Sequence, residues 1–333
     1  MSDLTKTLGI ELPLICGAMY PCSNAELVAA ASEAGAIGIV QPISLTFVHG
    51  HDFREGLRYI KSLTSKPFGL NVIVEKSAKI YEDRAKEWVD VALEEGVRFF
   101  VTSLGKPDWV VERAKAFGGI VYHDVTEARF AEKALAAGVD GLICVNSRAG
   151  GHTGKLGLSQ LKEKMSQYNV PLVAAGGIGS ETEFAAALEM GYAGCQLGTR
   201  FIATTECNAA DDYKKAIVEA SERDIVLTER LSGVPVSVIN NEYVQRTGTE
   251  VDPISKFFLQ TPATKHYARM ALQVTSLFSL KTANQKGKAY DNYWQAGKSV
   301  ATIDKIEPVA NIVGRFKEAY LNIKEDVLAA NNA

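Results

Sequence analysis

The sequence predicts a (β/α)8 barrel, a TIM barrel, with a mostly helical C-terminal extension over the barrel mouth. Two observations predict this fold. Over the first two-thirds of the chain, eight short and nearly continuous apolar runs alternate with amphipathic helical segments, as expected for parallel strands buried on both faces. Glycine and polar residues follow many of these runs, which favours a closed barrel over an open sheet with one ligand-binding switch point.

The eight predicted strands share a short apolar core followed by a polar or glycine-rich turn. They are residues 12–19, 36–42, 67–74, 97–103, 120–125, 141–147, 171–177 and 194–199.

The helical segments between these strands carry recognisable start and stop signals. The clearest of them are residues 24–34, 78–95, 108–116, 126–137 and 180–190. Polar residues that commonly cap helix N-termini stand at four of the starts, namely Asn24, Asp108, Thr126 and Ser180. A glycine follows four of the ends, where a left-handed conformation is expected, at Gly35, Gly96, Gly138 and Gly191.

After about residue 206 this alternation stops. A helix is expected over 209–223, strands over 225–229 and 234–239, a polar and aromatic stretch over 285–294, and a last helix over about 309–328. We therefore divide the chain into a cofactor-binding barrel, residues 1–205, and a helical extension, residues 206–333, that completes the active site as a lid.

Composition excludes several classes of protein. The 333 residues carry a net charge of −3, which gives no electrostatic reason to expect binding to nucleic acid or to an anionic membrane. No run approaches the length of a membrane-spanning helix and no signal region follows the N-terminus, so a cytoplasmic protein is expected. Five scattered cysteines without a C-x-x-C pair argue against a disulfide framework and a zinc site, and no metal is expected.

Two glycine-containing strand ends predict a phosphate site. Gly176 and Gly177 follow the seventh predicted strand, and Gly198 and Thr199 follow the eighth. Barrels commonly hold phosphate at these two loops, because glycines let backbone N–H groups approach the anion. The alternative is that these glycines only form tight turns.

The loop after the sixth strand, residues 149–154 (AGGHTG), supplies a candidate catalytic base. The imidazole of His152 can accept a proton near neutral pH, and the preceding glycines can lie along a flat ligand. Asn71 and His123 also lie in predicted strands and could contact a ligand. For each residue the alternative is a purely structural role. Two roles are open for His123, pairing with Asp124 or lending positive charge to a cofactor.

Five segments together carry a family resemblance: residues 13–19 (PLICGAM), 67–71 (PFGLN), 149–154 (AGGHTG), 175–178 (AGGI) and 196–201 (QLGTRF). In this order the chain resembles the nitronate monooxygenase family, formerly called 2-nitropropane dioxygenases, over nearly its full length. The same superfamily contains FMN-dependent enoyl-thioester reductases and NAD(P)H:quinone reductases. Residues 293–297 (YWQAG) resemble a C-terminal family segment that returns to the flavin.

The resemblance implies non-covalently bound FMN, with His152 as the catalytic histidine. The expected cofactor contacts come from the strand ends and the glycine loops. They are Gly17, Ala18, Met19, Asn71, His123, Ala149, Gly150, Gly151, Gly176, Gly177, Gln196, Gly198 and Thr199.

The chain departs from the family just before its histidine loop. Many relatives carry Gln-Gly-x-Glu where this chain has Val145, Asn146, Ser147 and Arg148. The glutamine contact is therefore lost, and Arg148 places a cation where relatives often have a carboxylate. This departure suggests an anionic substrate.

The implied reaction is oxidation of alkyl nitronates, and of nitroalkanes, by O2 to carbonyl compounds and nitrite. The substrates are small molecules, and a homodimer is compatible with the sequence. The nearest alternative is an FMN-dependent NAD(P)H:quinone or enoyl-thioester reductase. A flavin-free phosphate-binding barrel enzyme is a more distant one.

Overall fold

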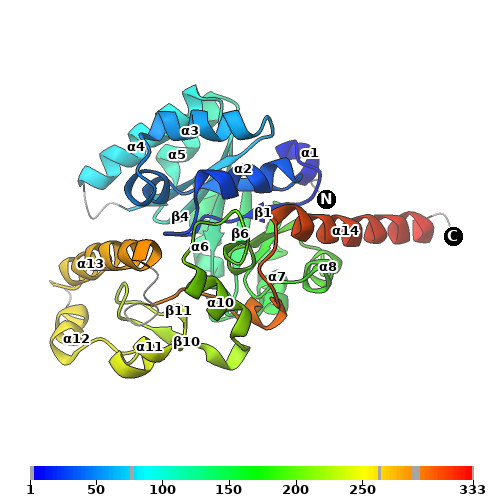
Figure 1. The fold of residues 1–333 in the computed structure, drawn as a ribbon. Coiled ribbons are helices and arrows are strands. Elements are labelled where there is room, and N and C mark those ends of the chain that lie inside the picture. The colour runs from blue at the N-terminus through cyan, green and yellow to red at the C-terminus, as the bar shows by residue number, and fades with distance from the viewer. Residues whose placement is uncertain (1–3, 76–78, 262–263, 287–292, 332–333) are drawn as a thin grey trace.

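The chain forms a closed barrel of eight parallel strands in a computed structural model that describes residues 4–75, 79–261, 264–286 and 293–331 (Figure 1). Each barrel strand coincides with one predicted run, so the predicted fold class is confirmed. The strands, in barrel order, are β1 (Leu14–Cys16), β2 (Ile37–Val40), β3 (Gly69–Val74), β4 (Phe99–Leu104), β5 (Ile120–Val125), β6 (Gly141–Val145), β8 (Leu172–Ala175) and β9 (Gly194–Leu197).

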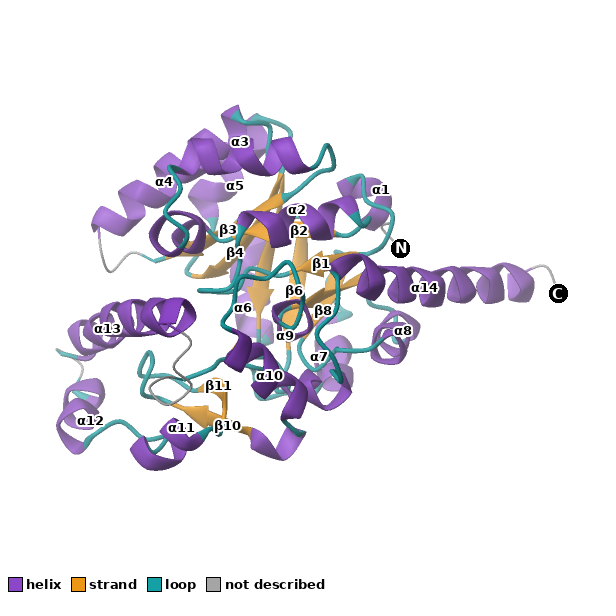
Figure 2. Ribbon diagram, in the orientation of Figure 1, coloured by secondary structure: helices purple, strands orange, loops and turns teal. Residues whose placement is uncertain are grey.

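Helices surround the barrel and alternate with its strands (Figure 2). After the short N-terminal helix α1 (Leu4–Leu8), they are α2 (Ala25–Glu33), α3 (Phe53–Leu63), α4 (Lys79–Glu94), α5 (Asp108–Ala116), α6 (Ala128–Ala136), α7 (Leu158–Met165) and α8 (Glu181–Glu189). A π-helical turn, Ser44–Val48, precedes α3.

The predicted helix ends are confirmed, and two of the four predicted N-cap residues, Asn24 and Ser180, stand at N-cap positions. All four glycines that follow helices have positive φ values, between 85° and 102°. Of the four predicted N-caps, Ser180 alone accepts a backbone N–H, from Glu183. Asn24 instead uses its side chain to donate to the Glu206 carbonyl, because a long-range partner lies within reach. The helices α5 and α6 begin after Pro107 and Glu127 rather than after the predicted residues.

Alternation along the strands separates two apolar layers. Residues such as Ile15, Ile39 and Ile143 pack inside the barrel, whereas their neighbours on the strands pack against the helices. Burial of each such aliphatic side chain contributes roughly 1.5–3 kcal/mol. The barrel is thus a filled core, and space for a ligand has to come from its ends.

The segment after β9 forms a second structural unit beside the barrel (Figure 1). It contains α10 (Asp211–Glu219), the 3-10 turn Glu222–Asp224, β10 (Ile225–Thr228), β11 (Val236–Ile239), α11 (Glu242–Thr247), α12 (Pro253–Gln260) and α13 (Lys265–Lys286). The sequence analysis missed these last three helices.

The two units share a small antiparallel sheet. Its third strand, β7 (Gly151–His152), comes from the loop after β6 and pairs with β11, so that the order is β10-β11-β7. The loop that carries the candidate catalytic histidine is therefore fixed by hydrogen bonds to the C-terminal segment.

The last helix, α14 (Val309–Asn331), belongs to the barrel wall. It packs against α8 and α2, which is the place of an eighth barrel helix, because only the four-residue α9 (Thr199–Ile202) directly follows β9. Both carboxylate oxygens of Glu206 accept the Val309 N–H, at 3.0 and 3.1 Å, where the chain returns. This corrects the expectation that the last helix covers the mouth. The boundary at residue 205 stays a prediction.

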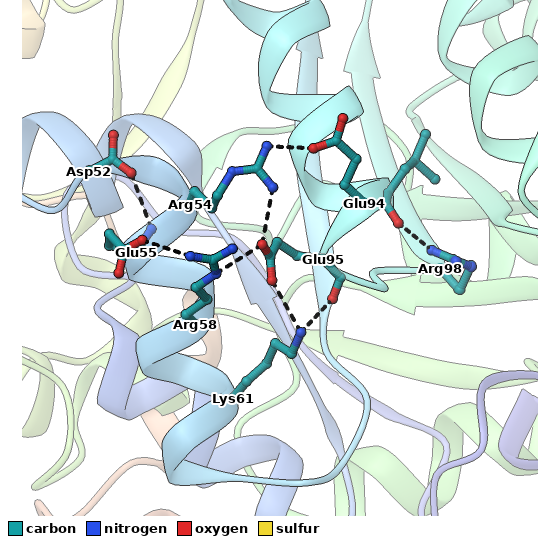
Figure 3. A network of polar contacts seen from close by, with 9 residues as sticks. Asp52, Arg54, Glu55, Arg58, Lys61, Glu94, Glu95 and Arg98 are labelled. Carbon is teal, nitrogen blue, oxygen red and sulfur yellow. Dashed lines mark hydrogen bonds and ion pairs between the residues drawn. The ribbon is translucent and has the colours of Figure 1, made fainter.

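On the outer wall, an ion-pair network joins α3 to the end of α4 (Figure 3). Arg54, Arg58 and Lys61 each lie within 3.1 to 3.2 Å of the carboxylate of Glu95. Burial acts to raise the pKa of Glu95, but hydrogen bonds from Arg54 and Lys61 outweigh it and lower that pKa. This carboxylate is covered by cations and is fully paired.

Candidate functional site

The mouth of the barrel gathers polar side chains from three different strands. Three of them occupy the alternate strand positions that face the barrel interior: Asn71 on β3, Asp124 on β5 and Gln196 on β9. The Asn71 Nδ2 atom donates to the Val101 carbonyl at 3.2 Å, which is the structural role weighed for it. Asp124 and Gln196 each have a buried side-chain oxygen atom without a hydrogen-bond partner among the described residues.

The Gln196 side chain is partly buried and packs against the end of the first strand. Among the described residues, its Oε1 atom has no hydrogen-bond partner. A Cβ atom on Gly17 would lie 3.0 Å from Gln196 Cγ, so the side chain fills the space that a residue other than glycine would need. Gln196 therefore contacts the loop after β1. Residues of this loop and Gln196 are both expected to contact the cofactor.

The Asp124 side chain is partly buried and faces the interior of the barrel. Its Oδ1 atom has no partner within the described part of the chain. Burial raises its pKa to about 7, and a hydrogen bond from Gln196 partly opposes that rise. A carboxyl group of this kind exchanges a proton near neutral pH. Sequence reasoning named Asp124 only as a possible partner of His123, because an oxygen atom without a partner is a property of the folded barrel.

His123 lies on the opposite face of β5 from Asp124. Its Nδ1 atom is 2.8 Å from the hydroxyl of Thr102 on β4, and burial lowers its pKa to about 4. The imidazole is therefore uncharged at neutral pH. This corrects the expectation that His123 pairs with Asp124 or supplies positive charge at the mouth, because neighbouring residues on a strand face opposite sides.

Asn146 organises the loop after β6, and sequence reasoning missed this role. Its Nδ2 donates to the Gly176 carbonyl at 2.7 Å, and its Oδ1 accepts the Arg148 N–H at 2.7 Å. Its carbonyl accepts the Thr153 hydroxyl at 2.7 Å. One fully buried side chain thus joins the histidine loop to the glycines after β8.

The glycines of the mouth are required where three loops approach closely. A Cβ atom on Gly176 would lie 2.7 Å from Ala149, and one on Gly150 would lie 2.8 Å from the Gly297 nitrogen. Gly177 has φ +72° and lies against the Arg148 side chain. Close packing therefore explains part of the glycine pattern without a ligand.

Backbone N–H groups at these loops decide whether a phosphate fits. Those of Gly179 and Ser180 at the start of α8 are taken by the Glu183 carboxylate, at 2.7 and 3.2 Å. The N–H groups at the start of α8 are therefore not available to a phosphate. Over the described residues, the N–H groups of Gly177, Gly198 and Thr199 donate to no acceptor. They remain suitable for an anion.

The segment 293–297 returns to the same loops. The Gly297 N–H donates to the Thr199 hydroxyl at 3.0 Å, and the Lys298 N–H donates to the Arg148 carbonyl at 2.9 Å. Trp294 stacks on Tyr213 with ring centroids 5.4 Å apart. On the other side, Met19 lies beside Gly198, with its sulfur 3.5 Å from the place of a Cβ atom there.

His152 lies at the edge of this site in β7, with its side chain exposed. Its Nε2 atom is 3.0 Å from the Ser232 hydroxyl, which also lies 3.3 Å from the Val234 carbonyl. If the hydroxyl donates to that carbonyl, it accepts from Nε2–H, which leaves Nδ1 unprotonated. The residue as a whole is exposed, but burial of its imidazole lowers the pKa of His152, so the ring is uncharged at neutral pH.

Arg148 is not a free cation. Its guanidinium forms an ion pair with Glu222, in the 3-10 turn after α10. The carboxylate of Glu222, which is distant in sequence, offsets this positive charge, and the anionic substrate stays a prediction.

Where the structure is described, no group of three or more histidine, cysteine or acidic side chains could hold a metal ion. No helix there is both long enough and apolar enough to cross a membrane.

Comparison with known proteins identifies the class of this barrel as an oxidoreductase. The sequence profile described as nitronate monooxygenase matches residues 1–318. The chain belongs to the nitronate monooxygenase family.

Individual relatives differ in the activity that their names state. The chain is 30% identical over 74% of its length, and 68% of the relative, to a Mycobacterium tuberculosis protein named (3aS,4S,5R,7aS)-5-hydroxy-7a-methyl-1-oxo-octahydro-1H-indene-4-carboxyl-CoA dehydrogenase. It is 25% identical to a probable nitronate monooxygenase of Staphylococcus saprophyticus, over 95% and 97% of the two chains.

Solved structures confirm the fold. FabK from Thermotoga maritima superposes with a TM-score of 0.80 at 28% identity and covers 99% of each chain. A nitroalkane oxidase from Streptomyces ansochromogenes superposes with a TM-score of 0.78, over 97% and 100% of the two chains, and at 24% identity it supports the fold alone.

Proposed function

We propose that this chain is an FMN-dependent nitronate monooxygenase that oxidises alkyl nitronates, and nitroalkanes after deprotonation, to carbonyl compounds and nitrite with O2. The observation that carries the proposal is the state of His152. It is uncharged, exposed in the loop after β6 and held by Ser232 through one ring nitrogen. Such an imidazole is suited to remove a proton from a neutral nitroalkane.

The residues present fit a flavin phosphate and ring. The free N–H groups of Gly177, Gly198 and Thr199 would hold the phosphate. Asn71, Gln196 and the backbone of Gly150 and Gly151 would lie at the ring. The unpartnered Oε1 of Gln196 supports this assignment. When bound, the flavin accepts electrons from the substrate and passes them to O2.

The chain itself handles the substrate proton. With Nε2 engaged by Ser232, Nδ1 of His152 would take the α-proton of a nitroalkane. A nitronate has already lost that proton, so for this substrate His152 would act by hydrogen bonding alone. The pair Arg148 and Glu222 would hold the loop in place without contributing net charge.

The test compares the two substrate forms in the flavin-loaded enzyme. His152→Ala should lower kcat/KM for a nitroalkane by about a hundredfold and lower that for the matching nitronate much less. His123→Asn is the control, because His123 faces away from the mouth. Equal losses on both substrates with His152→Ala would exclude His152 as the base.

A second candidate is an FMN-dependent reductase that uses NAD(P)H to reduce a quinone or an enoyl thioester. It is favoured by the 30% identical relative, whose name contains a carboxyl-CoA substrate. Anaerobic mixing with NADH separates the two candidates. Rapid bleaching of the flavin supports the reductase, and an unchanged spectrum supports the monooxygenase.

A further inference from the structure

The floor of the mouth contains two buried polar atoms without partners. Oδ1 of Asp124 on β5 and Oε1 of Gln196 on β9 both lack a hydrogen bond to any described residue. The Gln196 amide acts to lower the pKa of the Asp124 carboxyl group, in opposition to burial, so the two side chains are neighbours. Native proteins rarely leave such atoms unpaired, so two together point to a ligand that completes them.

The surroundings of Asp124 contain no counter-charge. On its own strand, Tyr122 faces the same side and burial keeps its phenol uncharged by raising its pKa, whereas His123 faces away and is neutral. The inward-facing positions of the other barrel strands are apolar, amide, hydroxyl or glycine residues. Among the residues that the structure describes, no charged side chain therefore acts on this carboxyl group.

We propose that Asp124 and Gln196 together bind the ring of the flavin, and that Asp124 does so with its carboxyl group uncharged. This inference rests on the proposed function, because it takes the flavin as the ligand of the mouth. It goes further by assigning a protonation state to a residue of this chain.

The chemistry of the pair matches a ring that has both N–H and carbonyl groups on one edge. An uncharged carboxyl group offers one O–H donor and one acceptor, and the glutamine amide offers both as well. An ionised Asp124 would offer acceptors alone and would repel the ring carbonyl oxygens in a buried site. The affinity for the ring should therefore fall as Asp124 loses its proton.

The experiment measures flavin affinity as a function of pH with the full-length chain freed of flavin by dialysis. The probe is riboflavin, which lacks the phosphate whose own ionisation would complicate FMN titrations, and binding is followed by fluorescence quenching. From about pH 5.5 to about pH 8.5, the wild-type affinity should fall about tenfold or more. Asp124→Asn keeps the shape but cannot ionise, so its affinity should stay constant.

The matched control is Asp140→Asn. Asp140 lies just before β6, where it pairs with Lys115 at 3.3 Å and accepts the Val121 N–H, away from the mouth. This variant should keep the wild-type pH dependence. A pH-dependent affinity that persists in Asp124→Asn would overturn the proposal.

Two further outcomes keep the proposals separable. A wild-type riboflavin affinity that is constant with pH overturns the role of Asp124 without any variant, even if Asp124→Asn fails to fold. If FMN binds under those conditions, the proposed function survives. If neither FMN nor riboflavin binds at any pH, the proposed function itself fails.

Discussion

Two carboxyl groups of this barrel, Glu95 on the outer wall and Asp124 at the mouth, meet opposite environments. Glu95 is covered by Arg54, Arg58 and Lys61, and its pKa is lowered (Figure 3). Asp124 lies deeper, meets no cation among the described residues, and has its pKa raised to about 7.

This difference distinguishes a carboxyl group with a structural role from one with a functional role in the same barrel. A carboxylate surrounded by cations joins two helices and stays ionised, so it can do little chemistry. A buried carboxyl group without a cation costs stability whenever it ionises, and such a cost is retained most often at functional sites. Four variants test this contrast, and the largest effect is expected at Asp124.

Asp124→Asn should stabilise the flavin-free protein at pH 8. Because the folded-state pKa is raised above the unfolded value, the wild type loses stability as pH rises from about 4 to about 7. The amide cannot ionise, so the gain at pH 8 is on the order of 4 kcal/mol at most, at about 1.4 kcal/mol per pKa unit. Urea unfolding at pH 5 and pH 8 measures it, and an equal effect at both values would contradict the assignment.

His152→Ala should lower kcat/KM for a nitroalkane by about a hundredfold, which corresponds to roughly 2.7 kcal/mol of transition-state stabilisation. The free energy of unfolding should change little, because the side chain is exposed. A large loss of stability in urea would mean that the histidine acts mainly in the β7–β11 pairing.

Glu95→Gln should destabilise the protein by about 1 kcal/mol above pH 5, because its cation partners are partly exposed and solvent weakens each pair. The lowered pKa means that this contribution is lost as pH falls through the acidic range, the opposite sign to Asp124. Flavin affinity should not change. A weaker flavin affinity in this variant would show that the wall and the mouth are coupled.

Ser232→Ala should have the smallest effect, about a three- to tenfold loss of kcat/KM on a nitroalkane with little loss on a nitronate. The hydroxyl selects which nitrogen of His152 carries the proton, and the ring itself remains. Steady-state rates on both substrates measure this, and an unchanged nitroalkane rate would remove Ser232 from the mechanism.

The sequence predicted the barrel well for a physical reason. Parallel strands buried on both faces are nearly continuous apolar runs, and Gly35 or Gly191 marks a helix end by local conformation alone. The two-residue strand β7 has no such local pattern, since its partner β11 lies more than eighty residues further along the chain. The place of α14 likewise depends on the long segment inserted after β9.

The candidate site was predictable in its glycines and its histidine but not in its charges. A motif can locate His152, whereas the ion pair of Arg148 with Glu222 and the outward face of His123 depend on distant partners. The isolation of Asp124 is of the same kind, because it depends on what all the other strands place inside the barrel.

The most direct test of the account is oxygen consumption by the flavin-loaded enzyme on an alkyl nitronate, set beside NADH-dependent quinone reduction under the same conditions. A nitronate monooxygenase should take up oxygen rapidly, release nitrite and show no dependence on NADH. Rapid NADH-dependent quinone reduction without oxygen uptake on the nitronate would contradict this assignment.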